Sequence, residues 1–133
     1  MYMLDTNILI YAMRHPNDPI CDKLIEHSAV DICISSITYA ELELGVLRST
    51  NPLRNRQALI TSLVGMDILD FGVKEASCFA QIKATLMQSG IVIEDMDILI
   101  GAHAMARGCR LVTNNVRHFS RIEGLEIEDW ITR

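Results

Sequence analysis

Blocks of apolar residues separated by polar turns predict a chain in which short strands alternate with helices. Four apolar runs have the length of buried strands, and a shorter run near the end is a candidate fifth. They cover residues 1–4, 32–34, 68–71, 111–113 and 125–127. Apolar strands of this kind fit a sheet that is buried on both faces.

Helical periodicity and helix-end signals predict helices in the intervals between these runs. Helices are expected over 8–14, 37–47, 73–88 and 95–106, and another from residue 52 onward. Asn7, Asn51 and Asp95 are the expected N-caps of three of them. Gly90 and Gly108 are typical left-handed helix ends.

This alternation predicts an α/β fold. Right-handed crossovers give a central, mostly parallel sheet of four to five strands with helices on both faces. The chain has 133 residues, of which 50% are hydrophobic, so we expect one domain, 1–133, with a substantial core.

Polar side chains gather where the strands are expected to end. Asp5 follows the first strand, Glu41 lies in the first turns of the helix after the second, and Asp97 begins the helix before the fourth. Asn114 and Asn115 lie just beyond the fourth strand. Because ligands bind at the carboxyl edge of open α/β sheets, we expect these side chains to meet at one edge.

Three carboxylates in one partly buried pocket would repel one another and lose hydration. A hard divalent cation with oxygen ligands neutralises such a group. Mg²⁺ or Mn²⁺ held by Asp5, Glu41 and Asp97 could orient a water and neutralise the charge that develops on a phosphodiester. The pattern therefore indicates metal-assisted phosphodiester hydrolysis.

Several of these residues also have an ordinary structural explanation. Asp5 could close an Asx turn, and Glu41 stands three residues after Thr38, which is the spacing of a capping box. Asp97 could stabilise the start of its helix through the helix dipole. His103 lies among small and apolar residues and is interpreted as a packing residue. Their joint placement at one sheet edge favours a functional site.

Composition restricts the location and the partners of the protein. A formal net charge of -5 argues against simple electrostatic wrapping of nucleic acid, although most of the cations are arginines, which suit phosphate. The cysteines show no CxxC pairing, and neither a leader peptide nor a membrane-spanning run is recognisable. We therefore expect a soluble cytoplasmic protein with reduced cysteines.

Four ordered motifs resemble those of the PIN-domain ribonucleases, specifically the VapC toxins of VapBC toxin-antitoxin modules. The motifs are LDTNILIY, SSITYAELELGVLRS, EDMDILIGAHA and LVTNNVRHF, and the likeness extends to the EDW sequence near the end of the chain. The resemblance implies a PIN-like three-layer α/β/α sandwich and Mg²⁺- or Mn²⁺-dependent endoribonuclease activity.

The same resemblance implies roles for individual residues. Asp5, Glu41 and Asp97 match the acidic triad of the family. Asn115 stands where the family often has a fourth acidic residue, and an amide oxygen is a weaker ligand, so one metal position is implied more strongly than two. The supporting residues would be Thr6 and Asn7, which match the polar pair that orients the leading aspartate, together with Thr113 and Asn114.

The resemblance also implies partners. Family members are usually homodimers that a VapB antitoxin inhibits, and their typical targets are tRNAs or other structured RNAs cut at exposed loops. Arginines close to the motifs could form a local rim for phosphate, and Arg117 is the best candidate for a phosphate contact.

Other functions fit the sequence less well. A non-catalytic PIN-fold interaction domain would be expected to have a damaged triad, and this triad is intact. A phosphotransferase with Asp5 as nucleophile would usually need a second carboxylate where Asn7 stands. A receiver domain would need a lysine late in the chain, but the last lysine is Lys83.

Overall fold

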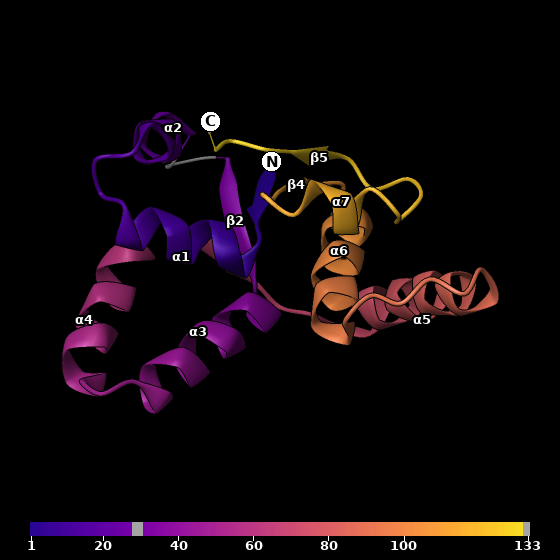
Figure 1. Ribbon diagram of the computed structural model, residues 1–133, viewed down its shortest axis with the longest axis horizontal. Coiled ribbons are helices and arrows are strands. Elements are labelled where there is room, and N and C mark those ends of the chain that lie inside the picture. The colour runs from indigo at the N-terminus through magenta and orange to yellow at the C-terminus, as the bar shows by residue number, and fades with distance from the viewer. Residues whose placement is uncertain (28–30, 132–133) are drawn as a thin grey trace.

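A parallel five-stranded sheet forms the centre of the molecule (Figure 1). The structure is a computed structural model that describes residues 1–27 and 31–131. The strands are β1 (Tyr2–Leu4), β2 (Ile32–Ser35), β3 (Asp67–Leu69), β4 (Arg110–Val112) and β5 (Ile127–Glu128). Every neighbouring pair in the order β3-β2-β1-β4-β5 is parallel. The predicted α/β class and sheet are confirmed.

The strand order creates a switch point beside β1. The chain moves from β1 outward to β2 and β3, and then returns to the other side of β1 to form β4 and β5. Tyr2 pairs with both Ile32 and Arg110, and Leu4 pairs with Val112. The ends of β1 and β4 therefore lie side by side at the position where open α/β sheets bind ligands.

Helices cover both faces of this sheet, which gives the three-layer arrangement (Figure 1). On one face lie α1 (Thr6–Arg14), α2 (Pro19–His27), α3 (Ser36–Arg48) and α4 (Pro52–Ser62). On the other face lie α5 (Val73–Gln88), α6 (Asp95–Arg107) and the single-turn α7 (Val116–Phe119).

Alternate residues of each central strand enter two different cores. Leu4, Ile34 and Val112 pack with the helices α1 to α4. Met3, Cys33 and Leu111, their neighbours in sequence, pack with α5, α6 and the segment after α7. Since successive side chains of a strand point to opposite faces, an unbroken apolar strand is what a sheet covered on both sides requires.

The structure contains two helices that the sequence patterns did not predict. α2 is amphipathic, with Ile20 and Leu24 buried four positions apart, but it is short and buries only these two residues, and α7 buries only Phe119. The other helices match their predicted positions closely, and α5 matches at both ends. Short helices with few buried residues depend on tertiary packing rather than on local pattern.

Two predicted N-caps are wrong. Asp5, not Asn7, caps α1, and its carboxylate accepts the Ile8 amide. Glu94, not Asp95, holds the N-cap position of α6. α1 starts at Thr6 rather than at Ile8, and α6 includes Asp95 as its first residue, so that the cap position falls on the residue before it. Asn51 is confirmed as the cap of α4, with its side-chain oxygen 3.2 Å from the Arg54 amide nitrogen.

Two further observations concern membrane-spanning helices and the cysteines. None of the helices formed by residues 1–27 and 31–131 combines the length and hydrophobicity needed to span a bilayer. All four cysteines lie in the described part of the chain and are free thiols, with Cys33 and Cys109 buried.

Candidate active site

The carboxylate of Asp5 lies at the carboxyl end of β1, in the middle of the sheet. Only 4% of the residue is exposed. Its Oδ1 accepts the Ile8 amide at 2.8 Å, and its Oδ2 accepts the Thr113 hydroxyl at 2.6 Å. The structural explanation of Asp5 as a helix cap and its proposed place in the site are therefore compatible. The same hydrogen bond that caps α1 also fixes the orientation of the carboxylate in the site.

Thr113 connects the ends of the two central strands. It follows β4 and is fully buried. While its hydroxyl donates to Asp5, the same oxygen accepts the backbone amide of Asn115 at 2.9 Å. The predicted supporting role of Thr113 has a geometric basis, since this one hydroxyl aligns both Asp5 and the turn that carries Asn115.

Thr6 contacts the second carboxylate rather than the first. Its hydroxyl donates to Glu41 Oε1 at 2.5 Å and lies 3.2 Å from the hydroxyl of the buried Thr38. This chain of polar contacts attaches Glu41, in the second turn of α3, to the start of α1. A capping box between Thr38 and Glu41 does not form, because Ser35 caps α3 and its hydroxyl accepts the Ile37 amide.

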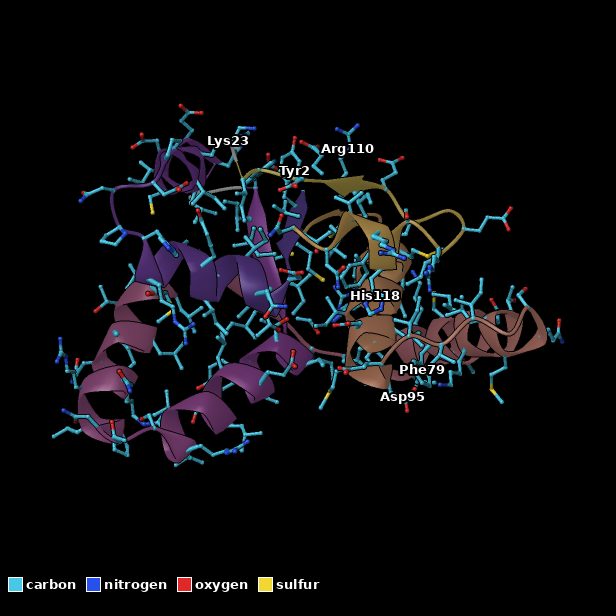
Figure 2. All side chains as sticks on the ribbon, viewed as in Figure 1. Tyr2, Lys23, Phe79, Asp95, Arg110 and His118 are labelled. Atoms are coloured by element: carbon cyan, nitrogen blue, oxygen red, sulfur yellow. The ribbon has the colours of Figure 1, made fainter. Side chains whose placement is uncertain are left out.

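Asp97 approaches the site from the first turn of α6 and is partly exposed. Its Oδ2 lies 3.6 Å from Nδ1 of His118, and the Asn115 side-chain amide lies 3.0 Å from the same nitrogen. Figure 2 shows His118 beside α6. Asp95 is engaged elsewhere, with its carboxylate 2.8 Å from Lys83 Nζ, so Asp97 is the aspartate of α6 that belongs to the site.

Electrostatics identify the three carboxylates as neighbours. Burial, and to a smaller extent the negative charges of Asp97 and Glu41, raise the pKa of Asp5 to about 6 despite the hydrogen bonds that favour its charge. Burial also raises the pKa of Asp97, and the nearby imidazole of His118 opposes that shift. Asp5 and Asp97 therefore carry their charges at a cost that a cation would offset.

The donor chemistry fits a hard divalent cation that keeps much of its water. Across residues 1–27 and 31–131, no three His, Cys, Asp or Glu side chains are close enough together to hold an ion directly. Mg²⁺ commonly binds through one or two carboxylates and several waters, so a complete protein cage is not required. Asp5, Glu41 and Asp97 provide only oxygen donors, which suit that ion.

The remaining predicted residues lie around this group. Asn7 and Asn114 are exposed, and the hydrogen bonds that hold Asp5 come from Ile8 and Thr113 rather than from Asn7. Arg117 is exposed on α7, close in sequence to Asn115. The interpretation of His103 as a packing residue agrees with its complete burial and its 2.7 Å contact to the Ser35 hydroxyl.

Sequence reasoning missed two members of the site, Thr38 and His118. Thr38 lies behind Thr6, and only the contact between α1 and α3 brings the two hydroxyls together. His118 follows Asn115 by three residues, which places both on one side of a helix if a helix begins there. Recognising α7 would have brought His118 into consideration.

Comparison with known proteins agrees with this geometry. The family described as the PIN domain matches residues 2–125, which is most of the chain. The chain belongs to the PIN-domain family. Among PIN-domain relatives, it is 42% identical to Ribonuclease VapC2 of Haemophilus influenzae over 130 residues, covering 98% of each chain.

Two further PIN-domain relatives match over nearly the whole length. The tRNA(fMet)-specific endonuclease VapC of Salmonella typhimurium is 36% identical, with 97% of each chain covered. The crystal structure of VapBC2 from Rickettsia felis, bound to a DNA fragment from their promoter, contains a chain with a TM-score of 0.92 and 38% identity. That match covers 97% of this chain and 98% of the other. The resemblance to VapC toxins that the four motifs indicated is confirmed.

Proposed function

We propose that this PIN domain is the toxin of a toxin-antitoxin module and acts as a metal-dependent endoribonuclease. The observation that carries the proposal is the buried carboxylate of Asp5 at the switch point of the sheet, with the charges of Asp97 and Glu41 close enough to raise its pKa. A protein that only needed a stable fold would gain nothing from this arrangement.

Asp5, Glu41 and Asp97 are the residues that would hold Mg²⁺ or Mn²⁺. When bound, such an ion lowers the pKa of a coordinated water and neutralises charge on the phosphodiester. Thr113 and the Ile8 amide fix Asp5, and Thr6 fixes Glu41, so the ligands are oriented before the ion arrives. His118 and Asn115 border Asp97 and would limit its motion.

We further propose that the substrate is RNA with an exposed loop, with tRNA as the first class to test. The name of the Salmonella relative specifies tRNA(fMet), and single-stranded loops are where RNA can be reached at its backbone. Arg117 on α7 remains the proposed phosphate contact. A VapB-type antitoxin, a homodimer and a cytoplasmic location complete the proposal, with the VapBC complex of the Rickettsia relative supporting the antitoxin.

Product analysis tests the chemistry. Purified protein would be incubated with total tRNA in Mg²⁺, in Mn²⁺ and in EDTA, and the ends of each fragment determined. Hydrolysis that breaks the P–O3′ bond leaves 5′-phosphate and 3′-hydroxyl ends, and we expect those ends only when metal is present. Ends with 2′,3′-cyclic phosphate would contradict the proposal, because they form by attack of the ribose hydroxyl.

A measurement of metal binding distinguishes a wrong substrate class from a non-catalytic protein. Titration of the protein with Mn²⁺, followed by electron paramagnetic resonance, is expected to reveal a site that Asp5→Asn weakens. If the ion binds but no RNA is cut, the substrate class is wrong. If no ion binds and no RNA is cut, a non-catalytic interaction domain becomes the better account.

A further inference from the structure

An open depression extends from the site along one side of α3. It has a volume of about 590 Å³ and begins at Glu41. Its lining is formed by Glu41, Leu44, Gly45, Arg48 and Ser49 of α3 together with Met96 of α6. Residues spaced by three, four and seven positions lie on one face of a helix, so this lining is a continuous strip. We call this feature the α3 depression.

The α3 depression exposes apolar surface beside the carboxylates. Leu44 is 54% exposed and Met96 is 45% exposed, although they come from different helices. Unbranched, polarisable methionine side chains adapt to the shape of a ligand. The strip therefore offers apolar contact area within one or two helical turns of Glu41.

Arg48 gives the far end of the depression a positive charge. It lies in the last turn of α3, where a cation also complements the helix dipole. Within the described residues, Arg56, Arg107 and Arg110 form ion pairs with glutamates, whereas Arg48 forms none. Its guanidinium is thus free to bind an anion, and phosphate matches its planar donor geometry.

Gly45 leaves the floor of the depression without a side chain. A glycine inside a helix costs about 1 kcal/mol relative to alanine. A Cβ atom at this position would meet no atom within 4 Å beyond its sequence neighbours and the nearby backbone of its own helix, so the packing of this chain does not require glycine. A glycine that intramolecular packing leaves unexplained is consistent with close approach of another molecule to the helix backbone.

We propose that the α3 depression binds the single-stranded RNA segment next to the phosphate that is cut. Arg48 binds a neighbouring phosphate, the backbone at Gly45 admits the strand, and Leu44 and Met96 contact its sugars and bases. The seven steps from Glu41 to Arg48 span roughly 10 Å along the helix, which suits a short stretch of strand. This inference rests on the proposed nuclease function and adds a substrate subsite to it.

RNA binding by an inactive protein tests the subsite. In an Asp97→Asn background, the affinity for total tRNA and for a fluorescein-labelled single-stranded RNA of mixed sequence would be measured at several salt concentrations. Arg48→Gln is expected to weaken binding roughly tenfold. It should also reduce the slope of log affinity against log salt by about 1, as loss of one phosphate contact does.

A control variant accompanies the test variants. Arg54→Gln removes an exposed arginine of α4 that forms no ion pair within the described residues and lies outside the depression. Gly45→Ala adds a Cβ where the strand is proposed to approach the helix backbone and should weaken RNA binding, and Gly45→Gln, with a longer neutral side chain, should weaken it more. Thermal unfolding of each variant establishes that the fold is retained.

The outcomes distinguish this inference from the nuclease proposal. If Arg48→Gln and Gly45→Gln retain full RNA affinity and, with Asp97 restored, normal cleavage, the subsite is wrong and the nuclease stands. If they leave RNA affinity unchanged but alter self-association in sedimentation, the depression is a protein interface and the inference is overturned. If the parent protein neither binds nor cuts RNA, the nuclease proposal fails and the subsite fails with it.

Discussion

The carboxylate of Asp5 is fixed by the Ile8 amide and the Thr113 hydroxyl, yet burial works against its charge. Its pKa in the folded protein is about 6, above the usual value of 3.8. The folded state thus holds this proton more tightly than the unfolded state does. The associated stability is fully present below about pH 4 and is lost as the pH rises through 6.

Asp5→Asn is therefore expected to stabilise the metal-free protein at neutral pH. At pH 7.5 in EDTA, the free energy of unfolding should rise by about 1–3 kcal/mol, because a buried charge is removed while an acceptor for the Ile8 amide remains. At pH 4 the gain should disappear. Urea denaturation at both pH values measures the effect, and a loss of stability at pH 7.5 would contradict it.

Thr6 is expected to matter through Glu41. Thr6→Val removes the hydroxyl that donates to Glu41 while keeping the side-chain shape, so Glu41 loses its fixed orientation. We expect cleavage to slow by roughly ten- to a hundredfold, in line with the cost of misplacing a group near the reaction. Thr6→Ser keeps the hydroxyl and should remain within a few fold of wild type. Equal rates for both variants would exclude this role.

At the scale of elements, glycines in α3 and α6 are expected to respond in opposite ways. Gly45→Ala adds a Cβ in open space and should raise the free energy of unfolding by about 0.5–1 kcal/mol through helix propensity. At Gly101, a Cβ would lie 3.1 Å from Cδ1 of Ile122 and 3.4 Å from Cδ2 of Leu125. Gly101→Val should lower stability by about 1–3 kcal/mol through overpacking.

Chemical denaturation of the two glycine variants provides the measurement. A lower free energy of unfolding for Gly45→Ala would contradict the expectation that a Cβ at this position meets only open space. If the Gly101→Val protein is as stable as wild type, the side chains of Ile122 and Leu125 can move away from the added atoms at little cost. The packing between α6 and this segment would then be loose.

The elements that sequence patterns predicted are those that bury continuous apolar surface. The runs at β1, β2 and β4 are short, but each has consecutive buried apolar residues, and α5 is a long helix with a periodic pattern. α7 could not be predicted in this way, because it is a single turn that buries only Phe119, whereas α2 has an amphipathic pattern that the sequence analysis did not assign.

Helix starts at the site were harder to predict than helix starts elsewhere. Asn51 follows the ordinary preference for an N-cap, and it was predicted correctly. At α1, Asp5 takes the cap position although Asn7 also suits a cap, and at α6 the cap position falls on Glu94, whose side chain makes no cap hydrogen bond. Functional aspartates in a first turn resemble ordinary helix caps, so sequence alone leaves their roles ambiguous.

At the scale of the whole molecule, topology brings distant residues to one edge. Asp5 and Thr113 are 108 positions apart in sequence, and their side chains are 2.6 Å apart because β1 and β4 are neighbours. The carboxyl-edge rule predicted this gathering of side chains. The partners of each side chain, such as Glu41 for Thr6 and His118 for Asp97, depend on helix packing that the rule does not specify.

The net negative charge of the whole molecule also bears on how it could bind RNA. The chain carries a formal charge of -5, and among residues 1–27 and 31–131 three arginines are paired with glutamates. Under the proposed function, association with RNA would depend on a few local cations and on the metal, rather than on the field of the whole protein. Cleavage by this protein should accordingly require divalent metal even at low salt.

The most direct test of the account compares two aspartates in the first turn of α6. Asp97 faces the site, whereas Asp95 pairs with Lys83 and is exposed, so Asp97→Asn and Asp95→Asn remove the same charge from the same turn. With total tRNA and Mg²⁺, we predict that Asp95→Asn cuts at the wild-type rate and that Asp97→Asn is slower by at least about a hundredfold. Equal activity in the two variants would contradict the proposed role of Asp97 and the metal-dependent mechanism built on it.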